Sequence, residues 1–479
     1  MKKKKYFEGE PPTVDSLGGV TNANLYIQEL WQKLREYEDR LKQSSRNSSK
    51  SPSSDTPEAK AERKKLKTPR SRNKVGAQPG HTGHKRPLAE LSDTDKVIEC
   101  KPQACCSACH HHVKINQQCS QRHQVFDLPN VPLEITEYQV FHGHCEYCNA
   151  TYKGELPENA PKGQIGARLI SHIAVLAGKY HLSVSQTRQL LLDQYGITFS
   201  TGAISEAQGK VSAMLTPTHQ SLKAHIHRAL HVHCDETSHS RNDEQGTRWC
   251  WLIASQDAVF QTVRYSRGKE SAKFMLGECK DNIVITDQYA AYNFINPEKH
   301  QLCLAHVLRN LQQMADYSGG GLTAFIGKRL VLILNTVFRT QHRYEHSLLT
   351  EAQWLRRMQR LKRSFKSLLE KGAETPSERY SGRCQHLLKH ETGLWVFVTH
   401  KGTPLTNNEA ERCIRGTVIM RKNCFGTSSD RGDKFRSRVL SVVETCKKRG
   451  LSALEVISEI VTAVTERKPY PDVFNLTSV

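Results

Sequence analysis

The chain has 479 residues, with 69 Lys plus Arg against 48 Asp plus Glu, which gives a formal net charge of +21. This length exceeds one ordinary domain, so two to four units are expected. The positive excess indicates a polyanionic partner. Nucleic acid is favoured over an anionic membrane because Lys and Arg release the counterions condensed on phosphates. An apolar run of membrane-spanning length is absent from the sequence, and Met1–Lys5 is not followed by the apolar segment of a signal peptide. We therefore expect a soluble, unexported protein whose fifteen cysteines are reduced or bind metal.

The N-terminal region carries apolar residues at alternating spacings of three and four, namely Ile27, Leu30, Leu34, Tyr37 and Leu41. This spacing is typical of a coiled-coil seam and predicts homo-oligomerisation. The alternative is a single amphipathic helix that packs on its own domain.

The segment from Gln43 to about Pro87 is rich in Ser, Pro, Lys and Arg and poor in apolar residues. Such a composition predicts a flexible basic linker. Its charges either contact DNA phosphates or are simply solvated.

Two C-x-x-C pairs follow the linker, Cys106 with Cys109 and Cys145 with Cys148. Four thiolates match the tetrahedral coordination of Zn²⁺, so we expect a structural zinc ribbon whose closed site takes no part in the chemistry. The segment Leu133–Val140 between the pairs alternates like a strand. Other potential ligands lie close by, namely Cys100, Cys105, Cys119, His110–His112 and His144.

Residues Gly166–Leu215 have a helical pattern in which His181–Gly196 and Ile197–Ser205 resemble helix, Gly turn, helix. These two helices either bind DNA and recognise its sequence or simply pack against the rest of their domain. Short β-type runs follow, namely Leu230–Cys234, Arg248–Ala254, Val259–Tyr265 and Ile283–Thr286, with a helix over Lys269–Leu276 before the last of them. This order suits a mixed α/β sheet, and the mostly helical block from Leu308 to Val396 is interpreted as an insertion.

Two carboxylates come at the expected ends of strands, Asp235 after Cys234 and Asp287 after Thr286. If the strands are neighbours, both side chains reach one place and can share a Mg²⁺ ion. On this feature alone the two residues are equally compatible with turns, which favour Asp.

Residues Pro404–Gly416 add a third acidic element, in which Asn407 or Asn408 is expected to cap a helix. The first turn of that helix carries Glu409 and Glu411, with Arg412 and Arg415 nearby. An acidic first turn that complements the helix dipole, with arginines in surface pairs, is the alternative.

Taken together, these segments resemble the insertion-sequence-66 family of transposases, whose large subunit has a DDE nuclease core. The resemblance extends over nearly the whole chain and includes several motifs in the same order. They are Leu41–Asp55, Gly76–His84, the two cysteine pairs, Asp235–Thr237, Thr286–Tyr292, Cys303–His306 with Arg309, Asn407–Arg412 and Arg421–Asn423.

The resemblance implies that Asp235, Asp287 and Glu411 form the catalytic acids, with Glu409 as the alternative third acid. They would hold Mg²⁺ or Mn²⁺ for DNA cleavage and strand transfer. Four cations are then candidates for binding DNA phosphates near the cut, namely Arg412, Arg415, Arg421 and Lys422. The chain departs from the family pattern at Gln288, where Gly is common, and at Thr406, where Asp is common; neither change removes a ligand.

Cys303 and His306 form a C-x-x-H pair that could be half of a second zinc site. A convincing second pair is absent from the sequence, so a helix start with His306 near the active site or in the core is favoured.

The resulting expectation is a multidomain α/β protein with an RNase H-like mixed-sheet core and a helical insertion. The predicted segments are 1–43 (coiled-coil helix), 44–95 (basic linker), 96–160 (zinc ribbon that binds DNA), 161–225 (helical), 226–312 (first part of the core), 313–399 (insertion), 400–447 (second part of the core) and 448–479 (C-terminal helix and tail). The expected partners are element ends, target DNA, a further copy of the chain and accessory proteins encoded by the same element. The expected location is the bacterial cytoplasm, at the nucleoid.

Two rival functions remain open. One is a DNA-binding regulator without catalysis, against which the intact acids argue. The other is a structure-specific or repair nuclease on the same sheet, which would cut without preference for element ends and without joining.

Overall fold

The computed structural model describes residues 12–48, 55–66, 82, 88–93, 96–105, 107–114, 121–126, 133–161, 163–244, 246–277, 279 and 281–476. The chain divides into two compact units. The first unit comprises residues 1–63 with 138–479, and the second unit comprises residues 64–137.

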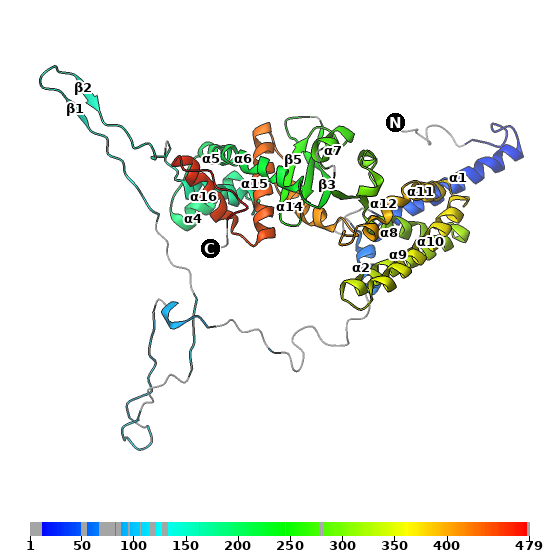
Figure 1. Ribbon diagram of the computed structural model, residues 1–479, viewed down its shortest axis with the longest axis horizontal. Coiled ribbons are helices and arrows are strands. Elements are labelled where there is room, and N and C mark those ends of the chain that lie inside the picture. Colours follow the sequence, from blue (N-terminus) through cyan, green and yellow to red (C-terminus); the bar gives the residue numbers. More distant parts are fainter. Residues whose placement is uncertain are drawn as a thin grey trace. The chain divides into compact units, whose positions relative to one another are not determined.

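The centre of the first unit is a five-stranded sheet with the strand order β5-β4-β3-β6-β7 (Figure 1). Its strands are β3 (His231–Ser240), β4 (Thr247–Ala254), β5 (Val259–Arg264), β6 (Ile283–Thr286) and β7 (His300–Leu302). β3, β4 and β5 are antiparallel neighbours, whereas β6 and β7 continue the sheet in parallel with β3. The expected mixed α/β sheet is therefore confirmed.

One strand is longer than its apolar run predicts. β3 continues beyond Cys234 to Ser240, because the polar residues after Cys234 pair with β4 as far as Ser240 opposite Thr247. The prediction that Asp235 ends this strand is wrong, since Asp235 lies in the middle of β3 opposite Leu252. The pattern was misleading because buried polar residues of this stretch have partners elsewhere in the fold: Glu236 bonds to Arg267 and Tyr292, and His239 bonds to Thr427 and Asp433.

Helices cover both faces of the sheet. They are α3 (Ala167–Gly178), α4 (Val184–Tyr195), α5 (Thr201–Met214), α6 (Thr216–Ile226), α7 (Lys269–Leu276), α14 (Asn408–Cys424), α15 (Asp430–Arg449) and α16 (Ala453–Thr465), with short 3-10 turns at Ala290–Tyr292 and Pro297–Lys299. The larger core packs Trp251 and Ile253 of β4 against helices that include α3, α5 and α15. Leu252 and Ala254, on the other face of β4, pack against α14.

The expected pair of helices around Gly196 is present as α4 and α5. Ser183 and Gln186 form a capping box at the start of α4, and Gly196 ends it in the left-handed conformation with φ of 66°. Leu191 and Ile204 are fully buried in the larger core. Packing therefore explains these two helices, and a DNA-reading role for them stays a prediction.

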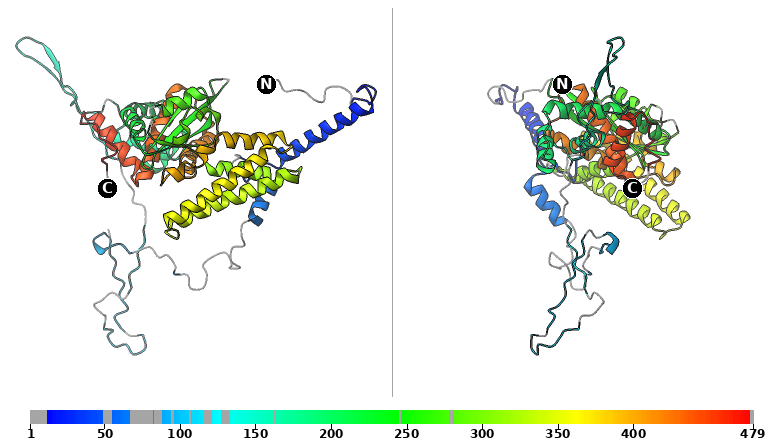
Figure 2. Two further views of the ribbon diagram at one scale, coloured as in Figure 1. Left: turned by 45° about the vertical axis from the view of Figure 1, so that its right-hand side comes forward. Right: turned by 90° about the vertical axis from the view of Figure 1, so that its left-hand side faces the viewer.

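The expected helical insertion forms a group with a core of its own. It comprises α8 (Leu304–Ala315), α9 (Gly321–Glu345), α10 (Glu351–Ala373), α11 (Glu378–Lys389), α12 (Glu391–Leu394) and α13 (Val396–Thr399). Both views in Figure 2 show α9 and α10 running side by side. By length and composition α9 could cross a membrane, but Ile326, Leu330, Leu334 and Val337 are buried in this core and its sequence carries four Lys and Arg.

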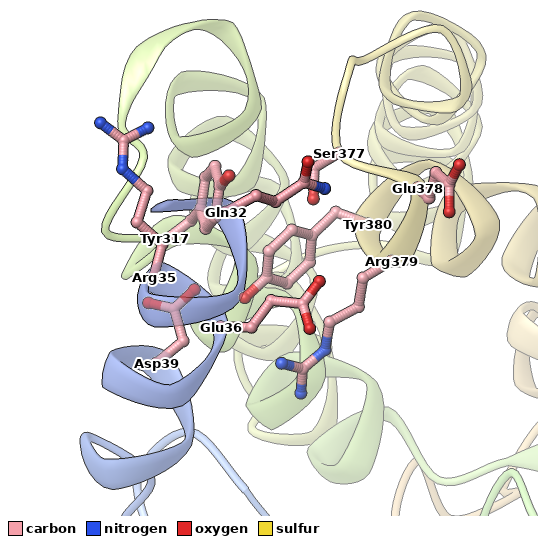
Figure 3. Close-up of a pocket in the computed structure, with 9 residues that line it drawn as sticks. All are labelled: Gln32, Arg35, Glu36, Asp39, Tyr317, Ser377, Glu378, Arg379 and Tyr380. Carbon is pink, nitrogen blue, oxygen red and sulfur yellow. The ribbon is translucent and has the colours of Figure 1, made fainter. Parts of the chain in front are cut away.

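The N-terminal helix α1 (Val20–Leu41) lies against this helical group with its polar face. Ser318 donates its backbone N–H to Asp39 at 3.1 Å. A cavity of about 350 Å³ lies between Gln32, Arg35 and Glu36 on one side and Tyr317 and Ser377–Tyr380 on the other (Figure 3). The expected helix is thus present.

The predicted basic linker contains a helix, α2 (Pro57–Leu66), so the expectation of an unstructured segment is wrong there. Thr56 accepts a hydrogen bond from the backbone N–H of Ala59, Pro57 opens the first turn and Glu58 complements the helix dipole. These three features stabilise the start of a helix, and this stabilisation outweighs the low apolar content of the segment. Other parts of the predicted linker lie outside the described residues.

The region of the cysteine pairs holds little regular structure in its described residues. It has a 3-10 turn at Leu91–Asp93 and a hairpin of β1 (His142–His144) with β2 (Thr151–Lys153). The prediction of a strand over Leu133–Val140 is wrong, because these residues form no regular structure. Alternation alone does not make a strand where no partner strand pairs with it.

Candidate active site

The parallel register of β3 and β6 brings two predicted acids to one level of the sheet. His231 lies opposite Ile283 and His233 opposite Ile285. The same offset sets Asp235 beside Asp287, the first residue after β6. Asp287 is held in its turn by the backbone N–H of Tyr289, which donates to Oδ1 at 2.8 Å.

The face of the sheet on which Asp235 lies is set by its partner on β4. Residues opposite each other in an antiparallel pair point to the same face. Asp235 is opposite Leu252, and Leu252 packs against Ala410 and Ile414 of α14. The Asp235 carboxylate therefore points to the face that α14 covers, and α14 carries Glu411.

The segment before α14 is fastened to β3 through Asn407. This residue occupies the N-cap position, but its side chain makes no capping hydrogen bond, so that part of the prediction is wrong. Its amide instead donates to the carbonyl of Cys234 at 2.7 Å and contacts His233 Nδ1 at 3.1 Å. The side chain of Asn407 thus bonds to buried groups of β3 and not to a backbone N–H of its own helix. These bonds fix the start of α14 over Asp235.

The acids repel one another in the absence of a counter-charge. Burial raises the pKa of Asp235 well above its usual range, and the charges of Glu236, Asp287 and Glu411 raise it further. A group of carboxylates at such a site fits a divalent cation, because the cation removes the repulsion and prefers oxygen ligands.

Glu411 also touches two residues of α8. Its Oε1 lies 3.6 Å from His306 Nδ1 and 3.4 Å from Arg309 Nη2. Among the described residues, Cys303, His306 and Glu411 gather three potential ligand atoms within 4.8 Å of one another. Cys303, however, is the N-cap residue of α8, accepts the backbone N–H of Asn407 at 3.1 Å, and has a pKa that burial raises to about 11. Cys303 thus has a structural role at the start of α8, and the interpretation of C-x-x-H as a helix start is confirmed.

Glu409 is turned away from this group. It forms ion pairs with Lys448 of α15 and, at 2.6 Å, with Arg412. Of the two acids on α14, Glu411 is the one that lies with Asp235.

Sequence reasoning assigned no role to Glu236, which is buried on the opposite face of β3. Its carboxylate accepts hydrogen bonds from Arg267 at 2.9 Å and from the hydroxyl of Tyr292. Burial raises the pKa of Glu236, and Asp287 raises it further. A signal for the position of Glu236 is present in the sequence. Successive residues of a strand point to opposite faces, so the residue after Asp235 is expected on the other face of the sheet.

The four predicted DNA-binding cations of α14 have different surroundings. Arg412 and Arg415 are exposed, and Arg412 pairs with Glu409. Arg421 donates to Thr237 at 3.2 Å and to Ser238, so it ties α14 to β3. Lys422 is exposed in the last turn of the helix. Arg412, Arg415 and Lys422 are thus on the surface, whereas Arg421 is engaged within the fold.

Each cysteine pair forms a similar hairpin. Cys105 bridges His112 around the first pair, and His144 pairs with Thr151 around the second pair. The residue after each pair, His110 or Asn149, has a positive φ of 59° or 54°. Backbone N–H groups of Cys148 and Tyr147 lower the pKa of the Cys145 thiol. The turn of Cys145 therefore suits a thiolate ligand; Cys106 of the first pair lies outside the described residues.

Comparisons with known proteins place most of these residues within one family. Residues 162–434 match the model of the family described as transposase IS66 family, and residues 9–87 match a family of unknown function. Uncharacterized protein y4hP of Sinorhizobium fredii is 23% identical over 355 residues, which cover 67% of this chain and 64% of that protein. Uncharacterized protein y4qI of the same organism is 22% identical over 416 residues, which cover 80% of this chain and 75% of that protein. The chain thus spans slightly less than two thirds of the length of y4hP.

Proposed function

Because this chain belongs to the IS66 transposase family, we propose that it binds the ends of an insertion sequence, cleaves DNA strands there and transfers them to target DNA. The observation that carries this proposal is the placement of three acids from separate elements where the charges of two of them act on the third. β3 supplies Asp235, the end of β6 supplies Asp287 and α14 supplies Glu411. The sheet order, with three antiparallel strands followed by two parallel ones, supports an RNase H-like core.

In this proposal Asp235, Asp287 and Glu411 hold Mg²⁺ or Mn²⁺. The bound ions would activate the attacking oxygen and stabilise the leaving oxygen of an in-line displacement at phosphorus. The fit rests on the donor set, because hard divalent cations prefer carboxylate oxygens and the pKa of Asp235 is raised by burial and then by its acidic neighbours.

Other residues of the chain would orient these acids and the DNA. Asn407 fixes the start of α14 on β3, and Arg309 with His306 keeps Glu411 in its rotamer. Arg412, Arg415 and Lys422 would bind phosphates near the cut, since they are exposed on the helix that bears Glu411. Arg421 would act indirectly, by holding α14 to β3.

We further assign the two cysteine pairs to one structural Zn²⁺ that would order a DNA-binding ribbon. The equivalent hairpins and the lowered pKa of Cys145 support this assignment. Purified under reducing conditions without chelator, the chain is expected to contain one zinc per polypeptide and to lose it in Cys145→Ser. Zinc below a tenth of the protein concentration in the parent chain would refute the assignment.

The test of the catalytic proposal uses purified chain and labelled duplexes that carry the flanking repeats of the element. Mg²⁺- or Mn²⁺-dependent nicks and joined strands are expected from the parent chain and from Asp281→Ala, an exposed carboxylate just before β6. Asp287→Ala should bind the same DNA and yield neither product. Nicking by Asp287→Ala at the parental rate would refute the acid assignment, and specific binding without any cleavage by the parent chain would favour a regulator or a missing accessory protein.

A further inference from the structure

Helix α10 carries an unusual run of positive charge. Between Ala352 and Leu369 it has six Lys and Arg and no acidic residue. The helical group to which it belongs, residues 304–399, contains 15 Lys plus Arg against 7 Asp plus Glu. A large part of the positive excess of the chain is therefore concentrated in this group, and α10 itself has no role in the proposed active site.

The charges are arranged on one side of α10. Trp354, Met358, Phe365 and Leu369 form the buried side. At about 100° per residue, three arginines fall on the side of the helix opposite these residues, and a fourth, Arg357, falls on the flank. These four arginines, which we call the arginine face, are Arg356, Arg357, Arg360 and Arg363, and all four are exposed.

Ion pairs do not neutralise the arginine face within the described part of the chain. Lys366, on the flank of α10, pairs with Glu391 at 3.1 Å, and Lys362 lies 4.0 Å from the same carboxylate. No ion pair joins any of the four arginines to a described acidic residue. Like charges three and four residues apart also destabilise a helix by a few tenths of a kcal/mol per pair. An ordinary solvated surface would intersperse acids here, as on α1, where Glu29 pairs with Lys33 and Glu38 with Lys42.

We propose that the arginine face of α10 is a second DNA-binding surface, which binds the phosphate backbone of a duplex without reading its sequence. Arg356, Arg360 and Arg363 form a row about 10 Å long, at a rise of 1.5 Å per residue. Duplex DNA presents about one charge per 1.7 Å of its axis, so this row can lie along several phosphates at once. The inference rests on the proposed function, because it takes DNA as the polyanion.

The test measures binding of the full chain to a fluorescent duplex of unrelated sequence, in EDTA, by anisotropy at a series of salt concentrations. The variant replaces Arg356, Arg360 and Arg363 by Gln. The matched control replaces Arg228, Lys269 and Lys434 by Gln; these three cations are also exposed but lie after α6, on α7 and on α15. Circular dichroism and thermal unfolding verify that both variants keep the parental fold.

The arginine-face variant should bind at least about tenfold more weakly at 0.1 M salt, and its slope of log K against log salt should fall by about 3. The control should change the slope by less than about 1. Equal losses in both variants, or none in either, would overturn the proposal and show binding by diffuse charge. Loss of binding to phosphatidylserine vesicles with unchanged DNA binding would overturn it in favour of a membrane.

The proposed function has a separate readout in the same samples. If the arginine-face variant binds DNA as tightly as the parent chain and still cleaves it with metal, the arginine face is not a DNA-binding surface. The proposed transposase function is then unaffected. A parent chain that binds no duplex under any salt condition would count against both.

Discussion

Glu409 and Glu411 stand two residues apart on α14, so their side chains leave the helix about 200° apart around its axis. This angle separates their roles. Glu409 reaches Lys448 and Arg412, and Glu411 reaches the group formed with Asp235. The sequence contains both residues in the same helical turn, and only the docking of α14 on the sheet distinguishes them.

A matched pair of variants tests this distinction. Glu411→Gln should lower strand cleavage by roughly 10²–10⁴-fold, because loss of a metal-binding carboxylate removes several kcal/mol of transition-state stabilisation. Glu409→Gln should retain cleavage within about threefold and destabilise the chain by at most about 1 kcal/mol, since its ion pairs are partly exposed. Single-turnover cleavage of a labelled end is the measurement. The reverse result would make Glu409 the third acid.

A second group of buried charges lies away from the acids of the active site. Asp433 of α15 contacts Arg241 at 2.7 Å, Arg248 at 2.9 Å and His239 at 3.1 Å, and it accepts the hydroxyl of Thr427. Burial by itself would raise the pKa of Asp433, but hydrogen bonds from His239, Thr427 and Arg241 outweigh it and lower the pKa to about 2.

The lowered pKa of Asp433 predicts a specific loss of stability in acid. The unfolded-state pKa of Asp is about 3.9. The contribution of this group is therefore complete above about pH 4 and is lost as the pH falls toward 2, about 2 kcal/mol in all. Denaturant unfolding at pH values from 5 to 2.5 should show this loss in the parent chain and a shallower pH dependence in Asp433→Asn. Parallel curves would contradict the assignment.

At the scale of elements, the turn after α14 decides how that helix returns to the sheet. Phe425 and Gly426 have positive φ values of 55° and 101°. Thr427 then donates its backbone N–H to the carbonyl of Ser240 at 3.1 Å. A Cβ on Gly426 would stand 2.1 Å from that same carbonyl oxygen, so only glycine fits here.

Two glycine variants on this element should change stability in opposite directions. Gly426→Ala should reduce the free energy of unfolding by more than roughly 3 kcal/mol, because it adds strain at positive φ to a clash with backbone. Gly416→Ala, inside α14, should increase the free energy by about 0.5–1 kcal/mol, because its Cβ would meet only Glu444 Oε1 at 3.5 Å. Denaturant unfolding measures both. A Gly426→Ala chain with parental stability would contradict the role of this turn.

On the scale of the whole molecule, α1 uses its two sides differently. Its polar side faces the helical group through Gln32, Arg35, Glu36 and Asp39 (Figure 3). The predicted seam lies on the other side, where Ile27 and Leu34 are about 60% exposed and Leu41 is 84% exposed. An apolar stripe of this kind fits a second copy of α1, and the expected oligomer stays a prediction.

The seam of α1 gives a test of self-association. The parent chain should sediment as a dimer or larger at micromolar concentration, and Leu34→Lys should shift it to the monomer, because a buried charge disrupts the seam. The control is Leu332→Lys, an equally apolar exposed position on α9. A monomeric parent chain, or equal effects of both substitutions, would rule out the seam as the contact.

Several elements and motif residues of this protein can be predicted from its sequence alone. The strands β4, β5 and β6, helix α7 and the helical group followed from local periodicity, since each of these segments buries one face or all of its residues. The motifs also indicated Asp235 and Asp287, because the type and order of residues in a motif are local properties of the chain.

Tertiary structure decided the features that depend on partners distant in the sequence. The length of β3 depends on β4, the side-chain bonds of Asn407 on Cys234 and His233, and the separate roles of Glu409 and Glu411 on where α14 packs. Likewise, the arginines of α10 form an exposed surface only because the apolar side of this helix is buried in the helical group. Each of these outcomes is fixed by packing across the fold, where burial and long-range hydrogen bonds outweigh the local preference of the chain.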